Sequence, residues 1–480
     1  MKIGILFEGT YPYVQGGVSS WAASLMRNEK NVDFVAIHVG ANPIRRLPKY
    51  KFSDNIKDYF EFFLFSSYKF EKQPVTDEFM EELVSIIRYP FEEIYMGEKL
   101  FNVLKKYNNF DYTTLIKNDI YWDFIIKLYN NFIPYENFNY YYWNLRSMLL
   151  PFLNALTVDI PVCDVYHSVT TGYAGLTALM ASLRYNKPYI ITEHGIYHRE
   201  RQLDLLRSKW VKDEYRIPWI RLFNTISALT YYGAAKVTTL FKKNQQIEKE
   251  LCDDHSKLEI IPNGIDYNHF SSIEKEEKTS VNIGLVGRVV EIKDIKTALK
   301  SIKIVSESIS EVKFYIIGPT DEEPDYFKEC KEMIDILNIG DIVEFTGMAD
   351  VSQWYSKLDI VVLSSVSEGQ PLVLLEAMAS GIPCVSTDVG ACSEIIYGTG
   401  EDNDIDGKCG LIVKPKDFSS MAKAINELIE NKEFYNSASE IGKKRVHKRY
   451  MVENMIEKYD GLYTGVYKKW LESDSGSTDL

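Results

Sequence analysis

Two glutamates, Glu368 and Glu376, stand eight positions apart and are the pair best placed for chemistry. The run before them, Asp359 to Ser364, is short, apolar and β-branched, which is typical of a buried parallel strand. Pro371 suits the first turn of a helix. We therefore expect Glu368 in a loop and Glu376 on the second helical turn, both facing a cleft above the carboxyl end of a sheet.

The start of this predicted helix favours an anion. The helix dipole places about half a positive charge there, beside unpaired backbone N–H groups, which belong to Gly369, Gln370, Leu372 and Val373. Carboxylates accept hydrogen bonds from sugar hydroxyls and repel bare phosphate, so the combination indicates a ligand with both parts, such as a nucleotide sugar. The alternative is an exposed helix residue at Glu376 and a solvated loop charge at Glu368.

The pattern of Glu368, seven residues, Glu376 and then Ala-Met-Ala-Ser-Gly-Ile-Pro-Cys-Val resembles the donor site of glycosyltransferase family 4. The resemblance covers nearly the whole chain, and residues 192–201 and 386–390 are most similar to the family's enzymes of Pel exopolysaccharide synthesis. It implies an α/β chain with two Rossmann-like domains facing a central cleft (GT-B). It also implies retaining, metal-independent transfer from a UDP-sugar, UDP-glucose or a UDP-N-acetylhexosamine, to a growing polysaccharide, with no cofactor.

The composition is that of a globular protein with two cores. The 480 residues are 45% hydrophobic and 26% charged, and the net charge of −13 argues against a nucleic-acid partner. The first residues lack the features of a secretory signal, and no apolar run approaches the roughly 20 residues that span a bilayer. We therefore expect a cytoplasmic protein, brought to the membrane only by a partner such as an inner-membrane polysaccharide synthesis and export complex. The six cysteines are scattered and the seven histidines form no metal-ligand spacing.

The first half of the chain, residues 1–270, alternates strands and helices around one interruption. A strand at 2–7, a glycine loop and a helix at 18–27 begin the series, and α/β alternation resumes at Cys163. Residues 51–151 are aromatic-rich and helix-like, with few glycines, so they predict a helical insertion in an acceptor-side domain. Its tyrosines are suited to core packing, to stacking on acceptor sugars or to binding a protein partner.

The second half begins after a polar stretch, His269 to Asn282, which by composition is a solvated linker. Strand-like and helical segments then alternate, which predicts a parallel sheet in a nucleotide-sugar-binding domain at 271–450. The family resemblance implies that the final helix, within 451–480, returns to the first domain.

Two cations, Arg288 and Lys293, follow the first strand of the second half and are able to reach one cleft. A charge-assisted hydrogen bond contributes roughly 1.5 to 3 kcal/mol, so the pair is able to stabilise a departing diphosphate in place of a metal. Without further evidence, one arginine and one lysine near a loop are more often surface charges than ligand-binding residues. The resemblance implies that both bind the diphosphate.

Further candidates follow other strands. His194 should lie at the carboxyl edge of the first sheet, and the resemblance implies that it contacts the donor sugar and lines the reaction centre. Gly16 and Gly17 permit close approach of backbone to diphosphate or acceptor. Gly318 and Met348 end strands on the cleft side and would flank the base. For each, a structural histidine or a simple turn is the alternative.

Three other motifs are weaker. His198 is a second choice to His194, and Arg199, Glu200 and Arg201 either bind acceptor or form a local salt-bridge network. Asp402 to Asp406 matches a metal-binding DxD pattern, but chance matches are common in an acidic, glycine-rich loop, so we assign no metal site.

In the resulting hypothesis, Arg288 and Lys293 stabilise the leaving diphosphate and Glu376 holds the ribose. Glu368 contacts the donor sugar, and His194 lines the opposite wall near the anomeric carbon. The alternatives are a nucleotide-sugar epimerase of the same fold, another glucan or lipid glycosyltransferase, and a binding subunit without turnover.

Overall fold

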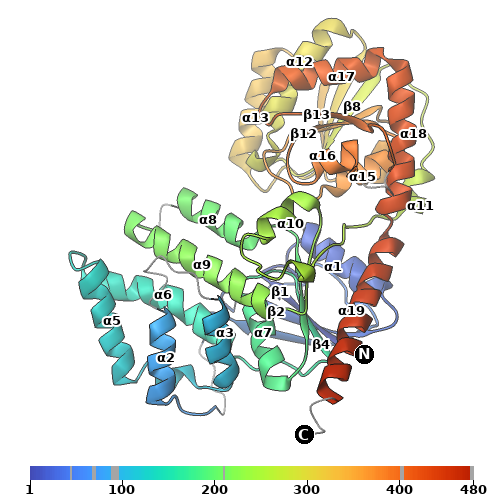
Figure 1. Ribbon diagram of the computed structural model, residues 1–480. Coiled ribbons are helices and arrows are strands. Elements are labelled where there is room, and N and C mark those ends of the chain that lie inside the picture. Colours follow the sequence, from blue (N-terminus) through green and yellow to red (C-terminus); the bar gives the residue numbers. More distant parts are fainter. Residues whose placement is uncertain (44–45, 67–71, 88–96, 209–210, 401–404, 476–480) are drawn as a thin grey trace. The chain divides into compact units, whose positions relative to one another are not determined.

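The computed structural model (Figure 1) describes residues 1–43, 46–66, 72–87, 97–208, 211–400 and 405–475. The chain divides into two compact units. Unit 1 comprises Met1–Thr239, Asn244–Ile260 and Lys458–Leu480, and unit 2 comprises Leu240–Lys243 and Ile261–Glu457.

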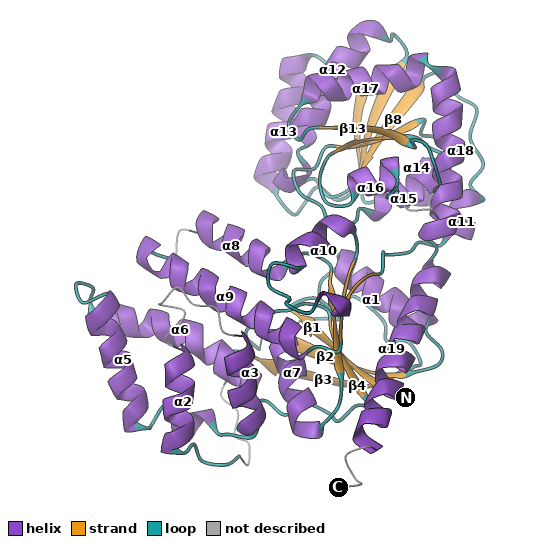
Figure 2. Ribbon diagram, viewed as in Figure 1, coloured by secondary structure: helices purple, strands orange, loops and turns teal. Residues whose placement is uncertain are grey.

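A parallel sheet forms the centre of unit 1. Its seven strands in the described residues have the order β3-β2-β1-β4-β5-β6-β7. The strands are β1 (Lys2–Glu8), β2 (Asp33–Gly40), β3 (Ile56–Phe63), β4 (Val165–Ser168), β5 (Tyr189–Glu193), β6 (Lys236–Thr239) and β7 (Leu258–Ile260). The central strands are buried almost throughout, because helices cover both faces of a parallel sheet (Figure 2).

The helices of unit 1 fall into two groups. Those that alternate with the strands are α1 (Gly17–Asn28), α7 (Tyr173–Tyr185), α8 (Tyr197–Arg207), α9 (Asp213–Gly233) and α10 (Lys242–Glu248), whose first residues belong to unit 2. The others stand between β3 and β4: α2 (Asp77–Ile87), α3 (Gly97–Lys106), α4 (Tyr112–Leu115), α5 (Asp119–Phe132) and α6 (Phe138–Thr157).

The helices between β3 and β4 share one hydrophobic core with the sheet. Tyr141 on α6, for example, is fully buried and donates a hydrogen bond to the carbonyl of Ile125 at 2.9 Å. Much of the aromatic content of this region is therefore used in packing. One segment differs from the sequence expectation: Ile56–Phe63 pairs with β2 as the edge strand β3 and is not helical. Its aromatic and β-branched residues suit a pleated edge better than a helix.

Helix α19 (Val452–Ser475) begins in unit 2 and continues into unit 1. There it buries Tyr459 and Tyr463 against the sheet. His167 is hydrogen-bonded through Nδ1 to the hydroxyl of Tyr463 and through Nε2 to Thr192, both at 2.7 Å. Burial lowers the pKa of His167 to about 3, so the ring is neutral and each nitrogen depends on its partner.

A second parallel sheet forms the centre of unit 2. The six strands that the structure describes in it have the order β10-β9-β8-β11-β12-β13. They are β8 (Val281–Val286), β9 (Val312–Ile317), β10 (Val343–Gly347), β11 (Ile360–Leu363), β12 (Cys384–Thr387) and β13 (Gly410–Val413). Side chains alternate between two cores along each strand: Ile360 and Val362 face one, Val361 and Leu363 the other.

Helices flank this sheet as well (Figures 1 and 2). They are α11 (Tyr267–Ser271), α12 (Ile295–Ser308), α13 (Pro324–Leu337), α14 (Val351–Tyr355), α15 (Leu372–Ala379), α16 (Cys392–Tyr397), α17 (Phe418–Glu430) and α18 (Lys432–Arg449). The chain therefore has the α/β fold with two Rossmann-like sheets that the sequence predicts.

The stretch expected as a solvated linker, residues 269–282, lies within unit 2. Lys275 donates to the carbonyls of Tyr355 and Leu358 at 2.9 and 3.0 Å, and Lys278 pairs with Asp359 at 2.9 Å. These lysines thus form hydrogen bonds and an ion pair within unit 2, so the stretch is not a purely solvated linker. The chain passes between the units at 239/240, 243/244, 260/261 and 457/458.

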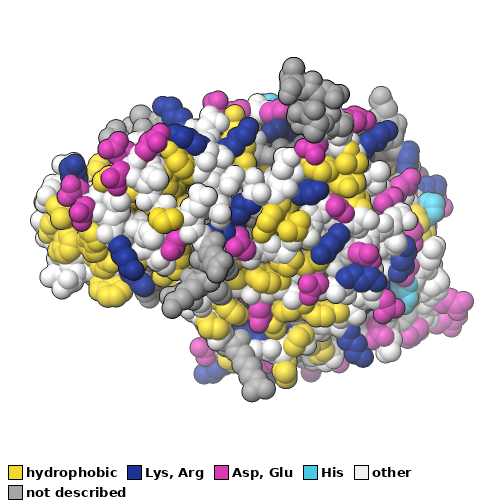
Figure 3. Space-filling model, turned by 90° about the horizontal axis from the view of Figure 1, so that it is seen from below, with side chains coloured by type: hydrophobic (Ala, Val, Ile, Leu, Met, Phe, Trp, Pro, Cys, Tyr) yellow, Lys and Arg dark blue, Asp and Glu magenta, His cyan; other side chains and the backbone are white. Residues whose placement is uncertain are grey.

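Within the described ranges, no helix combines the length and apolarity needed to cross a membrane. On the face shown in Figure 3, basic and acidic side chains are interspersed. That face therefore does not present the continuous basic surface that nucleic-acid binding requires.

The buried hydroxyl of Tyr463 gives a test of how α19 is held. Tyr463→Phe removes the partner of His167 Nδ1, and an unsatisfied buried polar atom costs about 1–3 kcal/mol. We expect the free energy of unfolding of unit 1 to fall by that amount in urea titrations. Thr464→Val, which removes an exposed hydroxyl from the same helix, should leave it unchanged. Equal stability of the two variants would contradict the assigned role.

Candidate active site

The loops after β8 and β11 meet at the point where the strand order of unit 2 reverses. β8 and β11 are neighbours, and the chain proceeds from them toward opposite edges of the sheet. Three hydrogen bonds join the two loops. Lys293 Nζ donates to Glu368 Oε1 at 2.6 Å, Ser364 Oγ to the carbonyl of Lys293 at 2.8 Å, and Val366 N to that of Ile292 at 2.9 Å. Ligands of open α/β sheets bind at this switch point.

The Lys293–Glu368 ion pair is largely shielded from water, with the two side chains 16% and 15% exposed. Ser365 Oγ also donates to Glu368 Oε1, at 2.5 Å. Both bonds fall on the same oxygen, so Oε2 keeps its acceptor capacity, and an ammonium group with three N–H donors keeps two for a ligand. The sequence predicted both residues, and the structure brings them into contact.

Two glycines let neighbouring loops pack backbone against backbone here. A Cβ on Gly318 (φ +152°) would lie 2.1 Å from the carbonyl oxygen of Gly287, and one on Gly390 (φ +52°) would lie 2.2 Å from those of Glu368 and Gly369. Both positions also have left-handed backbone angles that disfavour other residues. Gly390 thus fixes the loop that carries Glu368, and Gly318 supports the backbone beside Gly287.

Arg288 follows β8 and forms an ion pair with Glu322 at 2.5 Å. The two side chains are 50% and 48% exposed. An exposed pair of this kind contributes about 0–1 kcal/mol, so an anionic ligand would need little free energy to displace Glu322 from Arg288.

The start of α15 has no side-chain cap, and Pro371 occupies its N-cap position. The helix therefore presents its first N–H groups, including those of Leu372 and Val373, without a side-chain acceptor. The side chain of Gln370 accepts from Asn263 N at 2.7 Å and donates to Asn263 O at 3.2 Å, contacts that the expectation for its backbone N–H did not include. It fixes the entry to α15 against the segment after β7.

Glu376, on α15, accepts a hydrogen bond from Tyr355 at 3.0 Å. Burial raises the pKa of Glu376, and the Tyr355 hydroxyl and the charge of His269 oppose that rise. Glu368 and Glu376 therefore have separate partners.

The remaining predicted donor contacts are more open. Met348, after β10, is 76% exposed. In unit 1, a Cβ on Gly16 or Gly17 would have no heavy atom of the described chain within 4 Å other than those of adjacent residues and of α1 itself, and Gly16 begins α1 without a side-chain cap. Neither glycine is required by local packing, and both leave space beside a helix start.

His194 follows β5 in unit 1, where its ring lies against Trp21 with centroids 4.5 Å apart. Its Nε2 is buried without a hydrogen-bond partner in the described part of the chain. Burial lowers the pKa of His194 to about 3 and that of His198 to about 4, so both rings are neutral at physiological pH. His194 is therefore suited to hydrogen bonding and not to charge stabilisation.

Two carboxyl groups, Glu193 and Glu248, are fully buried at this end of unit 1. Glu193 accepts hydrogen bonds from Tyr231 and, at 2.8 Å, from Thr171. Burial raises the pKa of both groups, and for Glu248 the charge of Glu193 raises it further. The pair therefore retains a proton to higher pH than ordinary carboxyl groups do.

No group of three or more His, Cys, Asp or Glu side chains is arranged to hold a metal ion among the residues that the structure describes. Asp402, Asn403 and Asp404, which match the DxD pattern, lie outside those residues.

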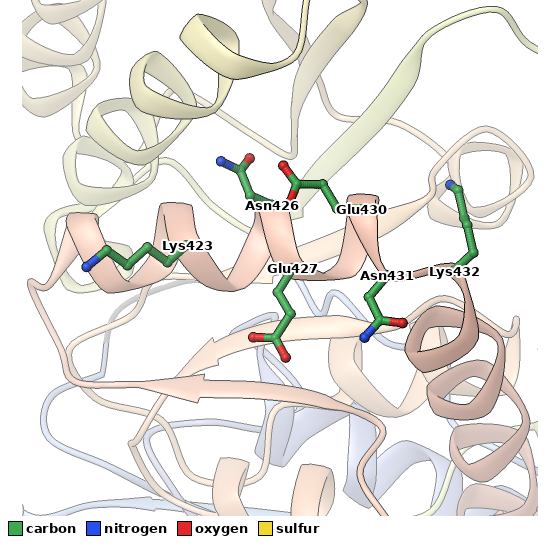
Figure 4. A pocket seen from close by; sticks show the side chains of 6 residues that line it. All are labelled: Lys423, Asn426, Glu427, Glu430, Asn431 and Lys432. Atoms are coloured by element: carbon green, nitrogen blue, oxygen red, sulfur yellow. The ribbon is translucent and has the colours of Figure 1, made fainter.

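The hollow shown in Figure 4 is separate from these loops. It has a volume of about 620 Å³ and lies along α17, and its lining consists of Lys423, Asn426, Glu427, Glu430, Asn431 and Lys432. None of the predicted site residues lines it.

Sequence reasoning missed three partners of the predicted residues. Ser365 directly follows an apolar strand, so its polarity was a usable signal. Glu322 and Tyr355 carry no comparable signal, because each lies in a different βα segment from its partner and only the fold brings them together.

The comparisons agree with this architecture. Residues 1–255 match the family described as "Domain of unknown function (DUF3492)", and residues 280–431 match "Glycosyl transferases group 1". The chain belongs to the DUF3492 family, its residues 280–431 match group 1 glycosyltransferases, and its fold is GT-B.

Curated relatives match over part of their length. N-acetyl-alpha-D-glucosaminyl L-malate synthase of Bacillus anthracis is 28% identical over 197 residues, which are 41% of this chain and 48% of the relative. The capsular polysaccharide biosynthesis glycosyltransferase CapM of Staphylococcus aureus is 24% identical over 215 residues, 43% of this chain and 54% of the relative. The chain thus spans about half the length of these relatives.

Solved structures of the same fold cover nearly the whole chain. Sucrose-phosphate synthase of Thermosynechococcus elongatus has a TM-score of 0.60 at 15% identity and covers 98% of this chain and 99% of its own. Anabaena HepE in complex with UDP has a TM-score of 0.58 at 14% identity, with 97% and 100% covered.

The buried acids of unit 1 predict a dependence of stability on pH. Because the folded-state pKa of Glu248 is raised above 4.5, its stabilising contribution is complete below that pH and is lost as pH rises through the folded pKa. Glu248→Gln should remove much of this decline in melting temperatures between pH 4.5 and 8. Glu250→Gln, at a half-exposed carboxylate two residues away, should retain it. A decline of equal slope in both variants would contradict the assignment.

Proposed function

We propose that the protein transfers a hexose or N-acetylhexosamine from a UDP-sugar to a growing polysaccharide, with retention of anomeric configuration and without a metal ion. The observation that carries the proposal is the Lys293–Glu368 pair at 2.6 Å, which supplies a cation and a hydroxyl acceptor together at the switch point of unit 2. A nucleotide sugar needs both.

The leaving diphosphate would be stabilised by the unused donors of Lys293, by Arg288 and by the uncapped start of α15. Lys293 and the start of α15 are in place before the reaction begins and Arg288 only exchanges Glu322 for the diphosphate, so little reorganisation is needed as negative charge develops on the departing oxygen. Lys293 is held by Glu368 and does not have to be ordered by the ligand. Gly318 brings the backbone beside Gly287 close to the same region.

The sugar and the nucleoside would be held by acceptors. Glu368 Oε2 accepts from hydroxyls of the donor sugar, and Glu376 accepts from the ribose while retaining its bond to Tyr355. Neutral His194 would line the reaction centre near the anomeric carbon, and an acceptor hydroxyl is the nucleophile. UDP is proposed by analogy with HepE, which was determined with UDP.

For the acceptor we propose an exopolysaccharide of the Pel type, assembled with an inner-membrane synthesis and export complex. The support is the resemblance of residues 192–201 and 386–390 to PelF. The relative CapM is also named as a glycosyltransferase of capsular polysaccharide biosynthesis. Release of free UDP together with a lengthened glycan distinguishes this function from an epimerase, which would return a changed nucleotide sugar.

The leaving-group role gives the first test. Lys293→Ala and Arg288→Ala should each lower the rate of UDP release from the preferred UDP-sugar about 100- to 1,000-fold, the usual effect of removing one donor from a developing anion. Lys296→Ala is a matched control, since this nearby lysine pairs with Glu329 outside the site.

Arg288→Ala is the sharper of the two variants, because its ion pair is half-exposed and its loss should not affect folding. Near-normal turnover of folded Arg288→Ala would remove Arg288 from the mechanism. Near-normal turnover of both variants would overturn the proposed site.

The ribose contact gives a second test. Glu376→Gln keeps an acceptor for Tyr355 but loses the charge, and hydrogen bonds to charged groups contribute about 1.5–3 kcal/mol. We expect the Kd for UDP, measured by calorimetry, to rise about tenfold. The Kd for 2′,3′-dideoxy-UDP should be the same in wild type and variant, since that ligand has no hydroxyls to donate. An equal loss of affinity for both nucleotides would show that Glu376 does not bind the ribose hydroxyls.

A further inference from the structure

Unit 1 contains a cavity that no part of the donor site uses. Its volume is about 330 Å³ and it is lined by Phe65, Pro151, Tyr173, Arg201, Asp204, Leu205, Trp219 and Phe223. These residues come from the segment after β3 and from α6, α7, α8 and α9. α7 follows β4 and α8 follows β5, so the cavity is built from segments near the point where the strand order of unit 1 reverses, between β1 and β4.

One side of the cavity is aromatic and rigid. Trp219 and Phe223 stack with centroids 5.4 Å apart and planes 30° apart, and Tyr173 meets Phe223 edge-on at 6.5 Å. All three are at least 93% buried, so their positions are fixed by packing. Phe65 also lines the cavity and is 43% exposed.

The other side is charged and partly unsatisfied. Arg201 Nη2 pairs with Asp204 Oδ2 at 2.9 Å, and the guanidinium lies 5.7 Å from the ring centroid of Tyr197. Arg201 Nε is buried without a hydrogen-bond partner in the described structure. The cavity lining therefore presents guanidinium N–H donors next to a carboxylate that is able to accept further hydrogen bonds.

A buried network lies beside Arg201. Glu8, at the end of β1, accepts hydrogen bonds from the Tyr197 hydroxyl at 3.2 Å and from Ala174 N at 3.1 Å. Burial raises the pKa of Glu8, and the charge of Arg201 acts in the opposite direction. Glu8 thus ties the starts of α7 and α8 to the first strand and fixes two walls of the cavity.

We infer that this cavity binds one pyranose ring of the acceptor glycan. A pyranose has an apolar C–H face, which packs on aromatic rings, and a rim of hydroxyls, which both donate and accept hydrogen bonds. The aromatic wall is able to pack against the C–H face, and the Arg201–Asp204 pair is able to hydrogen-bond to the hydroxyls. The volume is at the lower end of the range for ligand pockets and suits one sugar ring.

Other ligand classes fit less well. An anionic phosphate would meet the Asp204 carboxylate, and an alkyl chain would cover the charged Arg201–Asp204 pair without offering it a hydrogen bond. The assignment of the sugar as acceptor rests on the proposed function, but binding of the sugar itself does not. The inference gives α6 and α9 of the DUF3492 region a specific role in recognising the growing chain.

The test is carbohydrate binding in the absence of nucleotide. Saturation-transfer NMR on the full chain is run with homotrisaccharides of glucose, galactose, N-acetylglucosamine and N-acetylgalactosamine, and the best ligand is titrated. We expect at least one to bind wild type. Arg201→Lys, which keeps the charge but loses the Nε–H donor, and Phe65→Ala should each raise its Kd at least fivefold. Leu206→Ala, an exposed position on α8 outside the lining, should not.

Farnesyl phosphate serves as the apolar probe, and the melting temperature of every variant is recorded. Absence of binding by all four trisaccharides, unchanged affinity in both folded variants, or displacement of the bound trisaccharide by farnesyl phosphate would each overturn the inference. UDP is titrated into each protein in parallel. Loss of UDP binding in wild type would overturn the proposed function without altering the result for the cavity.

Discussion

The ion pair between Lys293 and Glu368 is the interaction on which the candidate donor site depends. Neither charge is well solvated, so each requires the other, and removal of one partner leaves an uncompensated buried charge. The pair also joins the two loops that flank the switch point of unit 2. The same contact thus orders the loops and holds a cation ready for an anionic ligand, which is the preorganisation that stabilisation of a leaving group requires.

In both units a side-chain contact connects segments that follow neighbouring central strands, but the residues that form the contact differ. In unit 2 a lysine and a glutamate connect the loops after β8 and β11. In unit 1 Glu8 connects β1 to the segment after β4 through Ala174 N, and nearby titratable groups are pushed toward neutral forms by burial. The charged pair of unit 2 supports the proposed nucleotide site there, and the neutral groups of unit 1 support the proposed binding of an uncharged glycan.

Much of unit 2 could be predicted because its information is local. The apolar run at 360–363, the loop with Glu368 and the helix after Pro371 appear in order in the sequence, and they form β11, a loop and α15. The Lys293–Glu368 contact spans 75 positions, and its geometry follows from the strand order, which no local pattern contains. Strand β3 and the bound stretch at 269–282 were misjudged because aromatic and charged composition does not reveal pairing partners.

A structure determined with UDP tests the central claim most directly. The account predicts pyrophosphate oxygens within about 3 Å of Lys293 Nζ and beside the first N–H groups of α15, with the ribose at Glu376. A pyrophosphate bound elsewhere, with the Lys293–Glu368 pair undisturbed and unconnected to the ligand, would contradict it.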